Sequence, residues 1–477
     1  MATTLTPDLC VIGAGASGLA VALAARRLGA SVVVVERGPP PGLGIKSSAL
    51  ALRALSAAAE HAAAVTSGEP FGVIGENARV SVRRVHDHVA EVVREHAPDN
   101  ARSRLEALGI ELVAGSASFS DPATVNAGDT RIRARRFVIA TGARSSVPDL
   151  PGLLAVPHFT PDTIFDNTRK LTHLVVIGAG PMGVELALAY RRLGAEVTII
   201  EAGNALAQSD PELADIALRR LRDLGITLHE GSAVSAIHAR SQGIGIDIRA
   251  GDEMSALDAS HILVAGPRSA NLSDLNLEAG KVKRSRTDPG ALALTSALRT
   301  SNHRVYAVGE AAGHAPAQHL SALEAEAVVR AALLGSFVRY DPASIPRLTL
   351  TDPPIAEIGL TEAGARLRLK TGYGVLRASY AESDAARAAR QGMGLVKLIV
   401  RADGRILGAG IVGEGAAELI AVIGLAMSAN VIAAGLARFA APYPSHAELL
   451  RQLGVQAAAG PADAWSQRRF ALRRLLP

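Results

Sequence analysis

One pattern occurs twice in this chain of 477 residues, and it restricts the possible folds more than any other feature. The first copy, "LCVIGAGASGLAVALAARRLGASVVVVERG", begins at residue 9, and the second, "LVVIGAGPMGVELALAYRRLGAEVTIIEAG", begins at residue 174. Each copy predicts a short apolar strand, a glycine turn, an amphipathic helix and a second strand that ends in a glutamate. Glu36 and Glu201 each follow the first glycine of their copy by 23 residues. The repetition predicts two βαβ units of one design.

The three glycines of each turn have separate mechanical roles. The first permits the tight turn, the second lets the backbone approach a pyrophosphate, and the third lets the helix pack against the strand. The helix N-terminus then presents free N–H groups to the phosphates, and the glutamate accepts hydrogen bonds from ribose hydroxyls. A carboxylate at Glu201 also repels a 2′-phosphate, so the second copy favours NADH over NADPH unless an arginine offsets it. The predicted dinucleotide ligands are the three glycines of each copy, namely Gly13, Gly15, Gly18, Gly178, Gly180 and Gly183, with the two glutamates.

Composition supports a globular α/β protein and argues against several other classes. Hydrophobic residues make up 48% of the chain and aromatic residues only 3%, so the core is built from Ala, Val, Leu and Ile. The net charge of +5 is spread out, and no basic stripe with interleaved aromatics predicts nucleic-acid binding. No uncharged apolar stretch reaches 18 residues, and the N-terminus has no signal-peptide pattern, so we expect a cytoplasmic protein.

Further segments occur in a fixed order along the chain. They are "RRFVIATGARSSVPDLPG" (135–152), "HILVAGPRSANLSDL" (261–275), "RVYAVGEAAG" (304–313), "IPRLTLTDPPIAEIGLTEAGA" (345–365) and "GMGLVKLIVRADGRILGAGIVGEGAAELI" (392–420). Together with the two glycine turns, they make the chain resemble the pyridine nucleotide–disulfide oxidoreductase family over about residues 7–455. The resemblance is to the branch that contains dihydrolipoamide dehydrogenase, glutathione reductase and mercuric reductase.

The resemblance implies a fold and two cofactors. It implies an α/β fold with two Rossmann-like dinucleotide-binding domains, for FAD and NAD(H), and a C-terminal α+β domain that forms a homodimer. The expected boundaries are 1–152 and 272–340 for the FAD domain, 153–271 for the NAD(P) domain, 341–460 for the dimerisation domain and 461–477 for a basic tail. Further cofactor-binding residues implied by the family motifs are Thr141, Gly142, Gly266, Gly309 and Glu310. The family has aspartate where Glu310 stands, so its hydrogen bond to the ribityl chain is expected to shift.

The segment "GPPPGLGIKSSAL" (38–50) departs from the family where its chemistry is most specific. The family carries two cysteines there, whereas this chain has one cysteine in all, Cys10, on the first predicted strand. The family lysine of this segment pairs with a glutamate that is present here as Glu185. In our alignment, Ser48 stands at the position of that lysine, and Lys46 lies two residues before it. Two interpretations of Lys46 therefore stay open: it pairs with Glu185, or its side chain is solvated.

The C-terminal motif departs in a matching way. In "APYPSHAELL" (441–450), Tyr443 stands where the family has its base histidine, and Glu448 holds the family's acid position. A phenol has a pKa near 10 and is a poor base at neutral pH. Tyr443 could instead donate a hydrogen bond or stack on an aromatic substrate, and His446 is a second candidate for proton transfer, although a surface histidine is the simpler interpretation.

Two functional hypotheses follow. The first is an FAD-dependent NAD(P)H oxidoreductase that passes electrons directly to a small-molecule acceptor, which could be a quinone, another oxidised small molecule, an oxyanion or a second nicotinamide nucleotide. Lys46, Glu185, Tyr443 and Glu448 are then the candidate catalytic residues. The second hypothesis is a catalytically silent FAD-binding scaffold or redox sensor. The arginine-rich tail suggests an interfacial helix on anionic lipid, a helix docked on the protein's own dimer or a frayed end.

Overall fold

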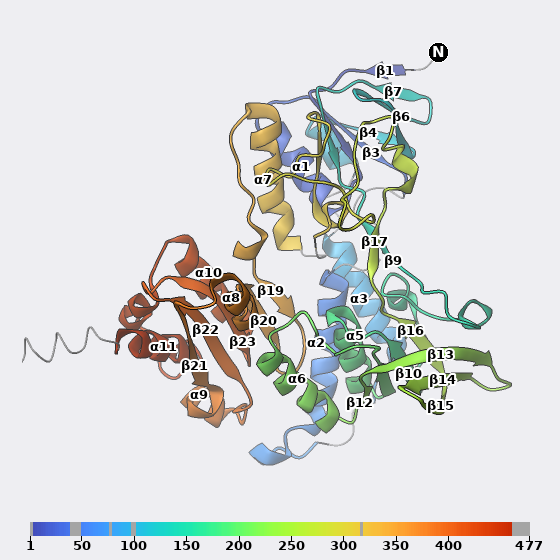
Figure 1. The fold of residues 1–477 in the computed structure, drawn as a ribbon. Coiled ribbons are helices and arrows are strands. Elements are labelled where there is room, and N and C mark those ends of the chain that lie inside the picture. The colour runs from blue at the N-terminus through green and yellow to red at the C-terminus, as the bar shows by residue number, and fades with distance from the viewer. Residues whose placement is uncertain (1–2, 39–48, 76–78, 97–101, 315–317, 460–477) are drawn as a thin grey trace, which may run out of the picture. The chain divides into compact units, whose positions relative to one another are not determined.

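The computed structural model describes residues 3–38, 49–75, 79–96, 102–314 and 318–459. The predictions for Lys46, Ser48 and the tail 461–477 lie outside these residues. The chain divides into two compact units, the first comprising Met1–Leu171 and His261–Asp341 and the second Thr172–Ser260 and Pro342–Pro477 (Figure 1). Both units are discontinuous in sequence. The five-part domain division from the sequence is finer than these two units and stays a prediction.

A parallel five-stranded sheet organises the first unit (Figure 1). Its strands lie in the order β18 (Val305–Ala307), β8 (Arg136–Ile139), β2 (Leu9–Ile12), β3 (Val32–Glu36) and β4 (Ile110–Ala114). The predicted strand–turn–helix–strand unit at residue 9 is present as β2, α1 (Ala16–Arg27) and β3. The strand predicted before Gly309 is β18, and the helix expected from about Gln318 is α7 (Gln318–Leu334).

Apolar side chains on both faces of the central strands give this sheet two buried faces. Leu9 and Val11 of β2 pack with α1 and α7 in one core, whereas Cys10 and Ile12 pack in a second core on the other face. Successive side chains of a strand point to opposite faces, so four consecutive apolar residues supply both cores. A smaller sheet contributes Phe119 and neighbouring residues to the second core. Its strands lie in the order β1 (Thr3–Leu5), β7 (Thr130–Ile132), β6 (Thr124–Ala127) and β5 (Ala117–Asp121).

The first unit contains further strands and helices. Two short strands, β9 (Ala143–Ser145) and β17 (Arg268–Ala270), pair antiparallel. Further elements include α2 (Ala49–Thr66), α3 (Val82–His96), α4 (Arg102–Ala107), β16 (His261–Val264) and the 3₁₀ turn Gly309–Ala312.

The second unit contains the second glycine turn. Its parallel strands β10 (His173–Ile177), β11 (Glu196–Ile200) and β12 (Thr227–His229) lie side by side in that order. Helix α5 (Pro181–Arg192) connects β10 to β11, as the sequence predicted, and α6 (Pro211–Asp223) connects β11 to β12. An antiparallel meander follows, made of β13 (Ser232–Ala239), β14 (Ile244–Ala250) and β15 (Glu253–Ala259).

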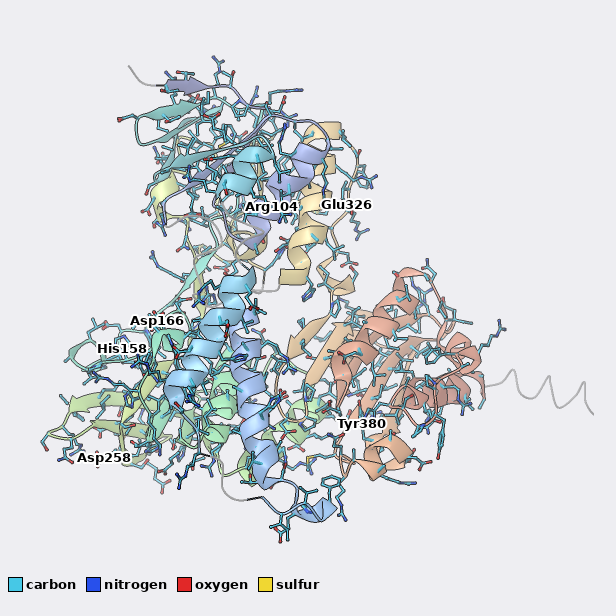
Figure 2. All side chains as sticks on the ribbon, turned by 180° about the vertical axis from the view of Figure 1, so that it is seen from behind. Arg104, His158, Asp166, Asp258, Glu326 and Tyr380 are labelled. Carbon is cyan, nitrogen blue, oxygen red and sulfur yellow. The ribbon has the colours of Figure 1, made fainter. Side chains whose placement is uncertain are left out.

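A second, antiparallel sheet completes this unit. Its order is β19 (Arg347–Thr349), β20 (Ile355–Gly359), β23 (Ile406–Val412), β22 (Leu395–Arg401) and β21 (Tyr373–Ser379). Helices α10 (Ala416–Ser428) and α11 (Glu448–Ala458) pack on it around the buried Tyr380, which Figure 2 labels. The short helices are α8 (Glu362–Leu369) and α9 (Asp384–Ala388). Within the described ranges, no helix is long and apolar enough to cross a membrane.

A buried ion pair joins this sheet to the part of the second unit that contains the second glycine turn. Asp210 caps the N-terminus of α6 by accepting a hydrogen bond from the Glu212 backbone N–H at 3.1 Å. Its carboxylate also receives the Lys397 ammonium from β22 at 2.9 and 3.0 Å, and both side chains are almost fully buried. Lys397 also pairs with Glu212 and Glu362, so one buried cation joins acids of α6 and α8 to the antiparallel sheet. Loss of Lys397 would leave Asp210 buried without its cation, so the lysine fixes α6 on this sheet.

Candidate functional site

The two glycine turns have nearly the same backbone geometry. Gly13 and Gly178 have φ values of +108° and +107°, a region that favours glycine. A Cβ on Gly18 would lie 2.0 Å from the Gly13 carbonyl oxygen, so the third glycine of the first turn is required for close packing of α1. A Cβ on Gly15 or on Gly180 would meet no atom within 4 Å. The second glycine of each turn therefore faces open space, as a site for a pyrophosphate requires.

The glutamates that end β3 and follow β11 are held in the same way. Glu36 accepts hydrogen bonds from the N–H groups of Ala14 at 2.7 Å and Gly38 at 2.8 Å. Glu201 accepts the equivalent bonds from Ala179 at 2.8 Å and Gly203 at 2.9 Å. Each carboxylate oxygen has a second lone pair, so the backbone orients both groups and leaves acceptor capacity for ribose hydroxyls.

Four motif segments meet at one edge of the parallel sheet in the first unit. Gly13 follows β2, Glu36 ends β3, Thr141 follows β8, and Gly309 follows β18. These four strands are neighbours and run parallel, so the segments share the carboxyl edge of the sheet, where ligands of such sheets bind. Gly309 has a φ of +62°, and a Cβ there would lie 2.6 Å from the Ser17 Oγ at the start of α1.

Two buried polar atoms at this edge have no hydrogen-bond partner among the residues that the structure describes. The Asn271 side chain donates to the Thr141 carbonyl oxygen at 3.0 Å, and its backbone N–H donates to the Gly142 carbonyl oxygen at 2.9 Å. The Thr141 Oγ1 and the Asn271 Oδ1 are buried without a hydrogen bond. A buried polar group without a partner is costly, so these atoms fit a polar ligand. Together with the open Gly15 turn and Glu36, they fit FAD.

Glu310 is engaged by an arginine that we did not identify from the sequence. Arg268 on β17 donates from Nε to Glu310 Oε1 at 2.5 Å and from Nη1 to Asp162 Oδ1 at 3.0 Å. Its Nη2 donates to the Ala143 carbonyl oxygen at 2.9 Å. Burial alone raises the pKa of Asp162, but the Ser145 N–H and the Arg268 guanidinium outweigh burial, so this pKa lies below its ordinary value. Glu310 is thus an ion-paired, largely buried side chain beside Gly142.

In the second unit, a second acid lies beside the loop that follows Glu201. Glu230, just after β12, accepts a hydrogen bond from the Ala205 backbone N–H at 2.9 Å. Its other oxygen pairs with Arg222 at 2.8 Å. The sequence has no lysine or arginine between Glu201 and Asp210. The loop itself therefore offers no cation to a 2′-phosphate, and the adjacent arginine is bound to a carboxylate.

Glu185 lies on α5, almost fully buried. Its Oε1 accepts the Leu350 backbone N–H at 2.7 Å. Burial raises the pKa of Glu185 to about 7, although the hydrogen bond from Leu350 acts in the opposite direction. No cation pairs with Glu185 among the residues that the structure describes, and Lys46, the predicted partner, is not one of them. Gly183, two residues before Glu185, is buried in α5, and Gly266 follows β16.

The C-terminal candidates lie on the surface and at a helix start in the second unit. Tyr443 is 73% exposed, and its hydroxyl lies 3.3 Å from Asp384 Oδ2. The Asp384 charge raises the pKa of Tyr443, which agrees with the expectation that this phenol is a poor base. Glu448 begins α11 and is half-buried. The His446 ring packs against Tyr380 with centroids 5.2 Å apart, and its Nδ1 is buried without a partner, so it is not a plain surface histidine.

Cys10 is a core residue. Its side chain is 0% exposed within β2, and burial raises the pKa of its thiol to about 12. The reactive form of cysteine is the thiolate, which this environment disfavours. Since the sequence contains no other cysteine, the chain has no thiol pair.

Two glycine turns at the carboxyl ends of parallel strands, each beside a glutamate held by backbone N–H groups, are typical of a protein that binds two dinucleotides. Comparison with known proteins gives the family. The model of the pyridine nucleotide-disulphide oxidoreductases matches residues 7–326, and that of their dimerisation domain matches residues 345–453. The chain belongs to this family, whose members bind FAD and NAD(P)H, and the matched dimerisation domain supports a homodimer.

Individual relatives span nearly the whole chain. A mercuric reductase from Streptomyces lividans is 31% identical over 454 residues, which cover 93% of this chain and 94% of that protein. A dihydrolipoyl dehydrogenase from Geobacillus stearothermophilus is 29% identical over 469 residues, covering 95% and 97%. Among solved structures, the HOCl-induced flavoprotein disulfide reductase RclA from Escherichia coli has a TM-score of 0.80 at 24% identity, covering 94% of this chain and 99% of that chain. The fold class expected from the sequence is therefore confirmed.

Proposed function

We propose that this protein is an FAD-dependent NADH:acceptor oxidoreductase that transfers electrons to a small molecule without a thiol relay. The observation that supports this proposal most strongly is that the chain has a single cysteine, Cys10. This residue lies buried in β2, and the pKa of its thiol is raised. A disulfide relay needs two sulfur atoms that can reach a substrate. Family membership supplies the FAD and NAD(P)H chemistry, and the cysteine content removes the usual intermediate carrier.

The residues have the following proposed roles. FAD, when bound, accepts a hydride from the reduced nicotinamide and delivers two electrons to the acceptor. The first glycine turn, Glu36 and the edge formed by Thr141, Gly142, Gly309 and Glu310 hold FAD. Gly266, which follows β16, stays a cofactor-binding candidate. The second glycine turn and Glu201 hold the nicotinamide nucleotide, with NADH favoured over NADPH because Glu201 and Glu230 both present negative charge near the ribose position. Lys46, Glu185, Tyr443 and Glu448 remain candidates for the acceptor side.

The acceptor stays open among a quinone, another oxidised small molecule, an oxyanion and a second nicotinamide nucleotide. Anaerobic mixing of the FAD-loaded protein with NADH, followed by each acceptor, tests the proposal. We expect NADH to bleach the flavin within seconds and a non-disulfide acceptor to restore its colour. Lipoamide, glutathione disulfide and mercuric ion should restore it no faster than buffer. A flavin that NADH does not reduce would support the silent scaffold, and rapid turnover of a disulfide would contradict the proposal.

A further inference from the structure

Three residues that lie opposite one another in the antiparallel sheet form a surface on which α6 begins. Glu357 of β20 and Lys397 of β22 both lie opposite Gly410 of β23, the strand between them (Figure 1). Residues that lie directly opposite on neighbouring strands point to the same face of a sheet. A Cβ on Gly410 would lie 2.5 Å from Leu213 Cδ1, so the glycine lets α6 approach the sheet closely. We call Glu357, Gly410 and Lys397 the α6-binding row.

The α6-binding row holds Asp210 by its backbone and by its side chain. The Asp210 N–H donates to Glu357 Oε1 at 2.9 Å. The Asp210 carboxylate accepts the Lys397 ammonium at 2.9 and 3.0 Å while it caps α6 through the Glu212 N–H. All three side chains that meet here are buried, and charge-assisted hydrogen bonds are strong where water is excluded. The antiparallel sheet therefore determines the position of Asp210.

Lys397 is the cation of this arrangement. Besides Asp210, it pairs with Glu212 and, at 2.8 Å, with Glu362 of α8. Arg377 of β21 binds the same two glutamates at 2.8 and 2.9 Å. Burial alone lowers the pKa of Lys397, but its hydrogen bonds with the three acids outweigh burial, so this pKa lies above its ordinary value. Lys397 is therefore charged at neutral pH, as a residue that holds a buried aspartate must be.

Asp210 ends the loop that follows Glu201, and this loop packs on the second glycine turn. The Gly203 N–H donates to Glu201 Oε1 at 2.9 Å. Leu206, which is buried, donates from its N–H to the Ala179 carbonyl oxygen at 2.9 Å. Ala179 lies between the first two glycines of the second turn. The loop therefore connects Glu201 and the glycine turn to the α6-binding row.

The part of the loop between Leu206 and Asp210 is a closed turn. The Ser209 N–H donates to the Leu206 carbonyl oxygen at 2.9 Å, one residue before Asp210. Leu206 has a φ of +50°, a conformation that is unfavourable for a residue with a side chain and persists where its surroundings hold it. Release of Asp210 would therefore loosen Leu206 and its contact with the glycine turn.

We propose that Lys397 is a positioning residue for the nicotinamide nucleotide. It holds Asp210, and through Asp210 it holds the loop 202–209 in the conformation in which Glu201 and the second glycine turn receive the nucleotide. The antiparallel sheet, which lies in the segment matched by the dimerisation-domain model, then contributes to the nucleotide site. The inference deepens the proposed function and rests on its assignment of the second glycine turn to NADH.

The test measures the dissociation constant for NAD⁺ by calorimetry on the oxidised, FAD-loaded protein. We expect K397M and D210N each to keep FAD and to raise this constant about tenfold, as loss of one hydrogen bond to a charged group would. Asparagine caps a helix as well as aspartate does, so D210N removes the link to Lys397 and retains the start of α6. The double variant should also show about a tenfold rise, because both substitutions break one connection.

Arg401 provides a matched control on the same strand. It lies at the end of β22, is exposed and pairs with Asp403, so R401M should keep the wild-type constant. Unchanged NAD⁺ affinity in K397M and D210N, with a lower melting temperature alone, would overturn the proposal, because the role of Lys397 would then be purely structural. A rise of about a hundredfold in the double variant would also overturn it, because the two residues would then act separately. D210N carries the test should K397M fail to fold.

This inference and the proposed function can fail separately. A wild-type protein that binds no NAD⁺ would contradict the assignment of the second glycine turn. Wild-type binding with unaffected variants would contradict only the role of Lys397. A failed acceptor assay changes neither result, because the titration contains no acceptor.

Discussion

The Arg268 guanidinium donates two hydrogen bonds to the Glu310 carboxylate, from Nε to Oε1 at 2.5 Å and from Nη2 to Oε2 at 3.4 Å. Both side chains are less than one-fifth exposed. Glutamate is one methylene longer than the aspartate that the family carries at this position, and here its carboxylate meets an arginine from β17. The same guanidinium also binds Asp162, so one cation satisfies two acids at the proposed FAD edge.

The variant R268M should therefore destabilise the first unit and weaken FAD binding together. It leaves Glu310 and Asp162 without their shared cation in a largely buried site, which costs on the order of 3 kcal/mol. We expect at least a tenfold rise in the dissociation constant for FAD, measured by flavin fluorescence, and a lower melting temperature. Arg144, exposed on the neighbouring strand β9, is the control, and R144M should change neither quantity. Wild-type affinity in R268M would show that the pair has no part in holding the cofactor edge.

The two open glycine turns predict separable losses of the two cofactors. In G15V the added side chain fills the space that a pyrophosphate needs while meeting no protein atom at its Cβ, and the same holds for G180V. We expect G15V to lose FAD, measured by the absorbance of the purified protein. G180V should keep FAD and lose NADH binding, measured by calorimetry. The apoproteins should melt within a few degrees of the wild-type apoprotein.

A second substitution in the first glycine turn, G13A, is the comparison for the melting temperature of G15V. In G13A the new Cβ would lie 2.3 Å from the Ala140 carbonyl oxygen at a φ of +108°, so the fold itself should be strained. G13A should therefore melt lower than G15V. Equal destabilisation of both would mean that the Gly15 turn is not an open ligand site.

The raised pKa of Glu185 predicts that stability depends on pH. The carboxyl group has a pKa of about 7 when folded, against an ordinary value of 4.5, so the folded protein binds the extra proton between these values. Stability is then fully present below about pH 4.5 and is lost as the pH rises through about 7, by on the order of 3 kcal/mol. Urea unfolding of the wild type and E185Q at several pH values measures this, and E185Q should lack the decrease.

The same experiment tests the predicted Lys46–Glu185 pair. A lysine beside Glu185 would lower the pKa of the carboxyl group and flatten the wild-type profile. In that case K46M should restore the decrease in stability with rising pH. A decrease already present in the wild type and unchanged in K46M would assign Lys46 to the solvent. Flat profiles in both proteins would contradict the effect of burial on Glu185.

Glu201, which follows β11, predicts which nicotinamide nucleotide the protein prefers. We expect the wild type to have a kcat/KM for NADH at least 100-fold above that for NADPH. E201A should reduce this ratio by roughly tenfold, about 1.4 kcal/mol, because it removes the carboxylate that repels a 2′-phosphate. E36A, the matched change in the other copy, should weaken FAD and leave the ratio unchanged. A ratio unaffected by E201A would place nucleotide selection elsewhere.

The sequence predicted local structure where short-range patterns determine it. Both glycine turns, the strands before Thr141 and Gly309, and the helix from Gln318 follow from apolar runs and glycine spacing, and the structure confirms them. Arg268 was missed because its partner Asp162 lies 106 residues away in sequence. Glu324, a buried residue of α7, was missed because its partner Gly309 contacts it through a backbone N–H, which leaves no side-chain signal in the sequence. A buried glutamate on an alanine-rich helix carries no periodic signal. Two short polar strands, β9 and β17, bring Arg268 to Glu310, and pairing of that kind is set by tertiary packing.

The most direct test of the central claim, electron transfer without a thiol relay, counts the electrons that the cysteine-free variant C10S takes up anaerobically. Flavin stores two electrons and a redox-active disulfide stores two more, so the count reports whether a second carrier exists. We predict that one equivalent of NADH per FAD fully reduces C10S, as it does the wild type, and that one equivalent of a non-disulfide acceptor fully reoxidises both. An uptake of four electrons per FAD, or loss of reduction in C10S, would contradict the account.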